Sequence, residues 1–234
     1  MSAVSGPSLL DPLSHITPMG NSRTDISTLR VAWSVDLGCW SVDRRIAAAI
    51  TQTVDSMRGS VASVIDAPAL FSAEDSMLWL NMWGIFMAAY YGDKVDKHLD
   101  DADPDVVSLV QLGRMFSAVD SKRMEIARSS TWQRVTSVLA TNDVIICPTM
   151  ARFPGPAAKA DNPFDLEADV TDGLWHSEDM TTVWNLVSPL PAVSVPCGFG
   201  VDGDSALPIG LQIVGRPGQE DVVLAVAAWI EERS

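Results

Sequence analysis

Three kinds of side chain in this sequence could attack a carbonyl group: serine hydroxyls, cysteine thiols and lysine amines. Each needs a nearby base and donors that stabilise the developing negative charge. Ser194 alternates with apolar residues in Val193–Val195, which predicts a hydrogen bond within a sheet rather than an exposed turn. Cys147 ends an apolar run with no local histidine, and Lys94 and Lys97 stand among aspartates at a solvated helix end. We therefore expect none of these residues to be catalytic.

Two other segments place side chains where a substrate could lie. Thr149 and Met150 follow the predicted strand Val144–Cys147, and open α/β sheets bind ligands at the carboxyl ends of their strands. Trp175 and His176 add two rings after a long loop rich in Pro, Ala and Asp. These four side chains are candidates for a substrate pocket, although Trp175 could instead pack on the core, because pockets and cores use the same apolar residues.

Metal and cofactor chemistry is not indicated. The sequence has three cysteines, an odd number, and they are widely spaced at Cys39, Cys147 and Cys197; the three histidines are scattered too. This pattern predicts neither a disulfide framework nor a zinc site and is typical of reduced thiols in a cytoplasmic protein. No Gly-x-Gly-x-x-Gly, Walker or His-Glu-x-x-His motif is present, so we expect no cofactor and no metal.

Composition narrows the possible partners. The chain has 234 residues, 47% of them hydrophobic, and a formal net charge of −14, which argues against nucleic acid and anionic membrane surfaces as partners. The start of the sequence lacks a secretory pattern. The most apolar run, Met77–Tyr91, is shorter than the ~20 residues of a membrane helix, so we expect a helix buried on nearly all sides.

The elements that must position these residues form an α/β pattern. A strand at Arg30–Ser34, a helix capped by Ser41 that runs to about Arg58, and a strand at Val61–Asp66 predict parallel pairing with a crossover. The helix carries one apolar stripe, formed by Val42, Ile46, Ile50, Val54 and Met57.

The rest of the chain completes a single domain over residues 1–234, with a loop-like segment at 1–28 and a mixed, largely parallel sheet covered by helices. The further predicted features are a capping box at Ser72–Asp75, a helix that begins at Asp103-Pro104, a break near Ser117 before a long helix to Ala140, a surface loop at 151–172, a short helix at Met180–Val187, strands at Ala192–Val195 and Ile209–Val214 with prolines at their ends, and a closing helix at Glu220–Glu232.

Several motifs recur in one order along the chain. They are Asn–x(5)–Pro-Ala-x-Ser-x-Pro-x-Gly at 185–198, Leu-Pro-x-Gly-Leu-Gln-x-Val-Gly-Arg-Pro at 207–217, a strand ending in Pro-Thr at 143–149, and shorter matches between 11 and 43. In this order they closely resemble the C-terminal part of the amidase signature family, the Ser-Ser-Lys hydrolases of amide bonds. The resemblance extends from about Asp11 to the end of the chain. Asn185 opens the strongest motif and could either contact substrate or fix the backbone of the Pro-rich turn.

The resemblance implies a hydrolase of carboxamide C–N bonds acting on a small-molecule amide. In the family the nucleophilic serine lies in a Gly-Gly-Ser-Ser-Gly-Gly-like loop of the N-terminal half. The sequence has no such loop, since Ser129-Ser130 falls within a helical pattern. Three hypotheses remain open: a C-terminal portion of an amidase that lacks the triad, a non-catalytic fragment or subunit that forms the substrate-pocket wall and needs a partner chain carrying the triad, and an unrelated α/β binding domain. The possible protein partners are an N-terminal amidase half or further copies in a homo-oligomer.

Overall fold

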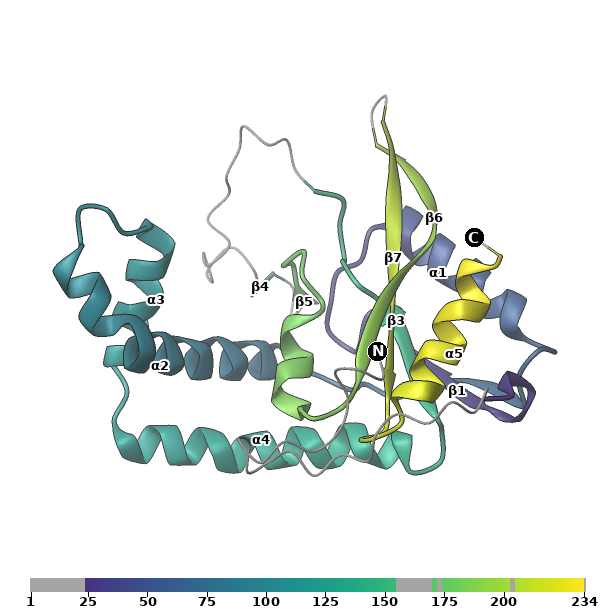
Figure 1. Cartoon of the computed structure of the whole chain (residues 1–234), viewed down its shortest axis with the longest axis horizontal. Helices are drawn as coiled ribbons and strands as arrows, with labels where there is room; N and C mark the ends of the chain where they lie inside the picture. Colours follow the sequence, from purple (N-terminus) through teal and green to yellow (C-terminus); the bar gives the residue numbers. More distant parts are fainter. Residues whose placement is uncertain (1–23, 155–169, 172–173, 203–204, 234) are drawn as a thin grey trace, which may run out of the picture.

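The computed structural model describes residues 24–154, 170–171, 174–202 and 205–233. Its main feature is a five-stranded sheet in the order β2-β1-β3-β7-β6 (Figure 1). The strands are β1 Arg30–Trp33, β2 Ser63–Asp66, β3 Val144–Pro148, β6 Ala192–Asp202 and β7 Ser205–Gly215.

The sheet is mixed, as predicted. β1 pairs in parallel with both β2 and β3, whereas β7 is antiparallel to β3 and to β6. β7 therefore runs opposite to the other four strands, which confirms a largely parallel sheet. The parallel β1–β2 pair, joined through a helix, is the predicted crossover unit.

Two helices cover one face of the sheet. α1 Arg44–Met57 buries the predicted stripe residues Ile46, Ile50, Val54 and Met57, and α5 Glu220–Glu231 lies beside it (Figure 1). Their side chains pack against Val31, Ile146 and Ile213 of three different strands. Burial of this apolar area is the largest favourable term for such a unit.

The opposite face is covered by other segments. They are the C-terminal part of α4 Ala118–Leu139, the 3-10 helix η3 Thr182–Val187 and the loops that follow the strands. Ile145 and Cys147 of β3 point to this side and have no exposed surface. All five residues of β3 are buried, as expected for a central strand covered on both faces.

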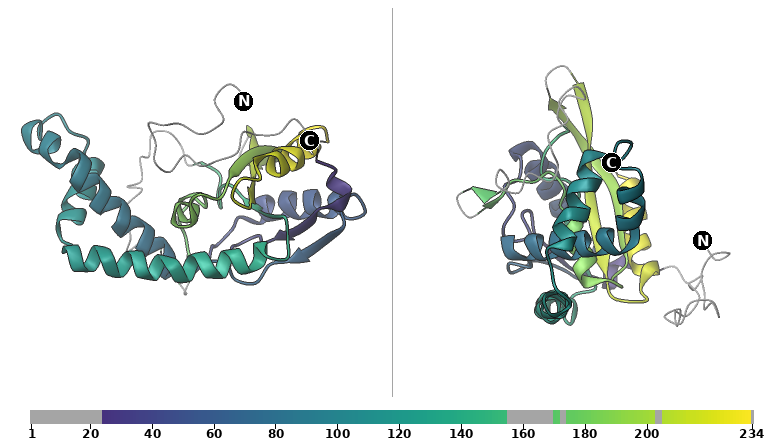
Figure 2. Two further views of the ribbon diagram at one scale, coloured as in Figure 1. Left: turned by 60° about the horizontal axis from the view of Figure 1, so that its bottom comes forward. Right: turned by 90° about the vertical axis from the view of Figure 1, so that its left-hand side faces the viewer.

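A helical arm extends away from the sheet (Figures 1 and 2). It consists of α2 Ala73–Lys97, α3 Pro104–Arg114 and the N-terminal part of α4. α2 and α3 cross closely at two glycines, since a Cβ on Gly113 would overlap the Gly84 carbonyl oxygen. The predicted capping box joins Ser72 to Asp75, whose other oxygen accepts a 2.5 Å hydrogen bond from Thr131 of α4 and so ties the arm together.

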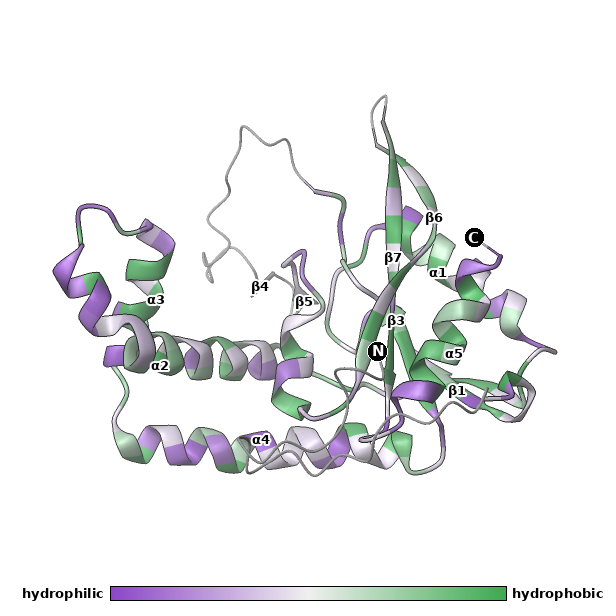
Figure 3. Ribbon diagram, viewed as in Figure 1, coloured by the Kyte–Doolittle hydropathy of each residue, from purple (hydrophilic) through white to green (hydrophobic). Residues whose placement is uncertain are grey.

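The prediction that Met77–Tyr91 is buried on nearly all sides was wrong. The side chains of Trp83, Phe86 and Tyr90 are 37%, 48% and 61% exposed. One side of α2 packs on α3, and its contacts with α4 and η3 are fewer, so the apolar run (green along α2 in Figure 3) exceeds the area that the arm covers. Among the described residues no helix is long and apolar enough to cross a bilayer.

Element boundaries differ from prediction in several places. The cap of α1 is Asp43 rather than Ser41, because the Asp43 carboxylate accepts the Arg45 N–H at 2.8 Å. The predicted helix at Met180–Val187 is the 3-10 helix η3, and residues 26–28 of the predicted loop form another 3-10 helix. Most of the predicted loop at 151–172, and residues 1–23, lie outside the described residues.

The last two strands are also longer than predicted. β6 and β7 form a hairpin with eleven residues in each strand and an irregularity between Pro196 and Phe199. Pro196 and Pro208 therefore lie inside strands, not at their ends. Within the described residues β6 pairs only with β7, so Pro196 stands on an edge strand, which tolerates a residue that cannot donate a ladder hydrogen bond. Pro208 precedes Leu211–Gly215, the part of β7 that also pairs with β3.

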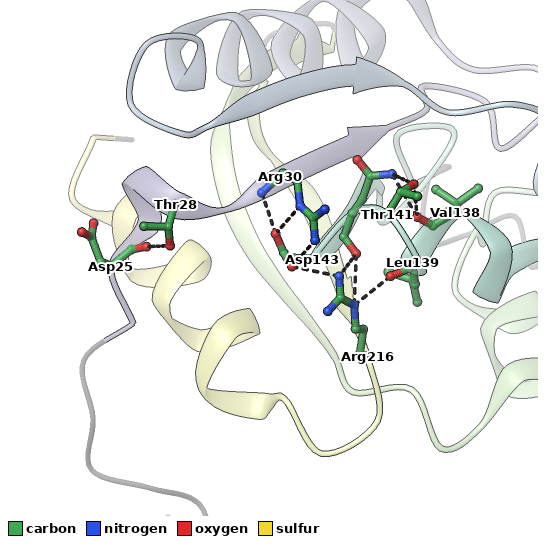
Figure 4. Close-up of polar contacts among 9 residues, drawn as sticks. Asp25, Thr28, Arg30, Val138, Leu139, Thr141, Asp143 and Arg216 are labelled. Atoms are coloured by element: carbon green, nitrogen blue, oxygen red, sulfur yellow. Dashed lines mark hydrogen bonds and ion pairs between the residues drawn. The ribbon is translucent and has the colours of Figure 1, made fainter.

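An arginine clamp joins the amino end of β3 to its neighbours (Figure 4). The Arg216 guanidinium donates to the carbonyls of Leu139 and Asn142 and to Asp143 Oδ1, at 2.7, 2.8 and 2.9 Å. The other Asp143 oxygen accepts the Arg30 backbone N–H at 2.8 Å. Partial burial alone would raise the pKa of Asp143, but the hydrogen bonds and charges of Arg30 and Arg216 outweigh it and hold that pKa below its usual range.

Candidate functional site

Three loops meet at the carboxyl ends of β1 and β3, and we call them the edge loops: 34–43, 149–154 and 174–180. The third begins with the short strand β5 Leu174–Trp175, which pairs with β4 Val170–Thr171. Trp175 donates its N–H to the Cys39 carbonyl at 2.7 Å, and its own carbonyl accepts the Ser41 N–H at 2.9 Å. The third loop is thus held beside the first like an added strand.

The second edge loop is tied to both of the others. The Ala151 carbonyl accepts the Asp43 N–H at 2.8 Å, and the Ala151 N–H donates to the Glu178 carbonyl at 2.7 Å. The Thr149 carbonyl accepts the Met180 N–H at 3.3 Å. These backbone bonds join the three loops into one surface.

The turn in the first loop explains its Asp-Leu-Gly sequence. Asp36 Oδ1 accepts the Gly38 N–H at 2.9 Å, and Leu37 and Gly38 have φ angles of 54° and 103°. A Cβ on Gly38 would lie 2.6 Å from that of Ala69, so glycine is needed for both backbone conformation and space. The Asp-Leu-Gly sequence therefore meets both the hydrogen-bonding and the packing requirements of this turn.

A pair of hydroxyls links three of the motif segments. Thr149 Oγ1 and Ser194 Oγ are 2.6 Å apart, and the Thr149 N–H donates to the Gly210 carbonyl at 2.9 Å. A Cβ on Gly210 would lie 2.9 Å from the Thr149 hydroxyl and 3.2 Å from the Ser194 hydroxyl. Glycine on β7 therefore leaves room for the pair. Ser194 is bonded to another hydroxyl rather than to a base, as a structural serine would be.

His176 is held by a residue that the sequence analysis missed. Its Nδ1 lies 2.6 Å from the Arg152 guanidinium. Arginine only donates, so Nδ1 is the acceptor in this contact. Arg152 stands two residues after Met150, at the start of a loop rich in Pro, Ala and Asp, and a basic residue next to two predicted substrate residues was the signal that could have drawn attention to it.

The other predicted substrate residues differ in their placement. Trp175 is 5% exposed and packs in the core, whereas Met150 is 36% exposed and bridges to Asp179. Asn185 lies apart on η3, with an exposed side chain that donates to the Thr182 carbonyl at 3.0 Å. The edge loops thus bring together Thr149, Met150, Trp175 and His176, and a role in substrate binding stays a prediction for all five residues.

The thiols are not activated. Burial raises the pKa of Cys147 far above its usual range, and it raises that of Cys39, also beside the Asp75 charge, to about 12. Lys94 lies over the rings of Tyr90 and Tyr91 at the end of α2. An open cleft of about 660 Å³ lies elsewhere, where α2 meets α4, and is lined by Asp75, Asn81 and Arg134 among others. None of the predicted substrate residues lines this cleft.

Comparison with known proteins places the chain in a family. The family model for Amidase matches residues 14–224. The acylamidase of Rhodococcus erythropolis is 27% identical over 97% of this chain and 48% of its own length. A glutamyl-tRNA(Gln) amidotransferase subunit from Brevibacillus brevis is 40% identical over 47% of this chain and 20% of its own length.

The fold agrees with that match. The solved structure of a bacterial aryl acylamidase, an amidase signature enzyme, superposes with a TM-score of 0.73 and 19% identity over 90% of this chain and 44% of that one. The chain spans about half the length, or less, of the relatives it matches. The family match over residues 14–224 and this shared fold show that the chain belongs to the amidase family.

Proposed function

We propose that this chain forms the substrate-facing wall of an amidase that hydrolyses carboxamide C–N bonds. The Ser-Ser-Lys triad is supplied by a segment outside this sequence, either on the same polypeptide or on a partner chain. The observation that carries the proposal is the convergence of the three edge loops at the carboxyl ends of β1 and β3, where an α/β sheet binds its ligand.

The wall offers both polar and apolar contacts to an amide. The Thr149–Ser194 pair can donate only one O–H within itself, so the second O–H is left for another acceptor. The Arg152 guanidinium adds positive charge beside His176, and Met150 presents an exposed thioether chain. A pocket that combines a few polar groups with apolar surface is the usual design for a small ligand.

The chemistry itself is assigned to the triad. In the mechanism that the family resemblance implies, the serine oxygen attacks the amide carbonyl, the C–N bond breaks as the amine takes up a proton, and water then hydrolyses the acyl-serine. Within the described residues the Ser194 hydroxyl is bonded to Thr149 and not to a histidine or lysine, which favours a structural rather than a nucleophilic role.

An assembly of two different chains is the second candidate. Its support is the relative that is named as a subunit of an amidotransferase. The coding DNA upstream of this sequence separates the two cases. A Gly/Ser-rich amidase loop in frame indicates one polypeptide, whereas the same loop in a neighbouring gene indicates a partner chain.

The test is reconstitution. The 234-residue chain is purified alone and after co-expression with a segment that carries the Gly/Ser-rich loop, and hydrolysis of an aryl amide is measured in both samples. We expect no turnover by the chain alone and turnover by a co-purified complex that is lost when the loop serine is changed to alanine. Turnover by the chain alone, abolished by Ser194→Ala, would contradict the proposal, as would a chain that ignores every such segment.

A further inference from the structure

We propose that Arg152 binds a carboxylate on the substrate and so selects amides that carry a negative charge. The inference rests on the proposed function, since it assigns a substrate class to the same three edge loops. Arg152 lies in the second of these loops, two positions after Met150 and three after Thr149. The Cα atoms of Thr149 and Arg152 are therefore at most about 11 Å apart, a distance that one small substrate can span.

The backbone at Arg152 is held on both sides. Ala151 is tied to the other two edge loops through its N–H and its carbonyl. Phe153 is buried, and its ring lies under the Arg45 guanidinium at 4.5 Å. The same ring packs so closely on Gly200 that a Cβ there would lie 2.2 Å from it. The Arg152 side chain thus starts from a fixed position, which a residue that orients a substrate needs.

The charge of Arg152 has no partner among the described residues. The guanidinium is partly buried, and its Nη2 lies 2.6 Å from His176 Nδ1. It forms no other hydrogen bond or ion pair with the part of the chain that the structure describes. An imidazole carries no negative charge, so the contact orients the guanidinium without neutralising it.

Arg152 differs in this from the other arginines at described positions. Arg44 is exposed to water, and Arg128 donates to two backbone carbonyls. The rest form ion pairs with Asp or Glu: Arg30, Arg45, Arg58, Arg114, Arg123, Arg134, Arg216 and Arg233. The chain has 30 acidic residues against 16 basic ones, so the missing partner does not reflect a shortage of carboxylates.

The acidic residues of the edge loops are engaged elsewhere or face water. The Asp43 carboxylate is held by Arg45. The carboxylates of Asp36 and Asp179 accept backbone N–H groups within their own turns, at 2.9 and 2.6 Å. Glu178 is exposed, so water and salt screen its charge. None of these four forms an ion pair with Arg152, and the guanidinium remains available to a ligand.

A carboxylate is the ligand that this arrangement favours. Arginine is not deprotonated in proteins, and a partly buried charge is unfavourable until it is paired. Its planar fork of N–H donors matches the two oxygens of a carboxylate. Met150, 36% exposed in the same loop, offers apolar contact beside it. We therefore expect a substrate in which a carboxylate is joined to an apolar acyl or amine group.

The test compares two anilides in the reconstituted enzyme, with release of aniline as the readout. One is 4-anilino-4-oxobutanoate, and the other is N-phenyl-4-oxopentanamide, in which a neutral acetyl group replaces the carboxylate. We expect the unchanged enzyme to have the higher kcat/KM for the acid. Arg152→Gln should lower kcat/KM for the acid roughly ten- to a hundredfold more than for the neutral anilide.

Two further variants separate geometry from charge. Arg152→Lys keeps the positive charge but lacks the planar fork, so its kcat/KM for the acid should lie between those of the unchanged enzyme and of Arg152→Gln. It also provides the comparison if Arg152→Gln does not fold. Arg44→Gln is the matched control, because it removes an exposed arginine next to the first edge loop, and it should leave the preference for the acid unchanged.

The outcomes distinguish this inference from the proposed function. Equal kcat/KM for the two anilides, or an equal loss for both in Arg152→Gln, would overturn the inference and leave the amidase proposal in place. The same loss of preference in Arg44→Gln would overturn it too, because the effect would then come from net charge. Turnover of neither anilide would instead contradict the proposed function, and the inference would fall with it.

Discussion

The five-stranded sheet with the segments that cover it, here called the sheet unit, buries its apolar side chains more completely than the helical arm does. In the sheet unit β3 is buried over its whole length, and separate apolar cores lie on its two faces. In the arm a small core between α2 and α3 leaves three large rings exposed. Those of the amidase-like motifs that fall on described residues lie in the sheet unit, and none of them falls within α2, α3 or α4.

This difference separates two roles. The sheet unit fixes the edge loops through backbone hydrogen bonds and the register of β3, β7 and β6. The arm contributes an exposed surface joined to that unit through the contacts of α4 and η3. We therefore expect changes in the sheet unit to affect folding as a whole, and changes in the arm to act locally.

The largest effect is expected from Ile46→Asp. Ile46 is buried in the core between α1 and the sheet, and a carboxylate there would have no partner. We expect a loss of about 3–5 kcal/mol in the free energy of unfolding, measured by urea denaturation. Ala48→Asp, on the exposed side of the same helix, is the control and should cost less than about 1 kcal/mol. Equal effects would show that the stripe of α1 was misplaced.

A smaller and local effect is expected from Gly113→Ala. The new Cβ would overlap the Gly84 carbonyl, so α2 and α3 must move apart, at a cost of about 1–3 kcal/mol. We expect faster hydrogen exchange in α2 and α3 and unchanged exchange in the sheet. Ser108→Ala, on the exposed side of α3, should leave hydrogen exchange unchanged both in α2 and α3 and in the sheet. Faster exchange throughout the sheet would remove the distinction between the two regions.

The smallest effect concerns Asp143 and depends on pH. Its folded-state pKa lies below the unfolded value of about 3.9, so the ionised carboxylate adds stability above about pH 4 that is lost as the pH falls through the folded-state pKa. Asp143→Asn should therefore destabilise the protein at neutral pH and have a smaller effect in acid, near about pH 3. Ile50→Val removes no ionisable group, so it should lower the free energy of unfolding by the same amount at both pH values. An Asp143 effect that grows in acid would contradict the assigned clamp.

Local signals in the sequence predicted much of the fold. The spacing of Ile46, Ile50, Val54 and Met57 gave the buried side of α1, and Asp103-Pro104 and Ser117 marked the starts of α3 and α4. The helix predicted to end near Arg58 does end there, and Gly59, which follows it, has a φ of 89°. Each of these features depends on residues within one or two turns.

Long-range features were harder to predict. The Thr149–Ser194 pair exists because β3, β7 and β6 pair in one register, and no local pattern contains that information. The exposure of Phe86 and Tyr90 depends on how much of α2 the small helix α3 can cover. Arg152 and His176 meet across a separation of 24 positions. Composition and periodicity carry no information about such contacts.

The central claim is that the edge loops, and not the arm, face the substrate. The most direct measurement compares Met150→Ala with Ile126→Ala in the reconstituted enzyme, since both side chains are exposed and neither change should affect folding. Loss of the Met150 contact, about 1–2 kcal/mol, should lower kcat/KM for an aryl amide by roughly five- to thirty-fold, whereas Ile126→Ala should leave it unchanged. Equal kcat/KM for Met150→Ala and the unchanged enzyme, or a larger loss from Ile126→Ala, would contradict the account.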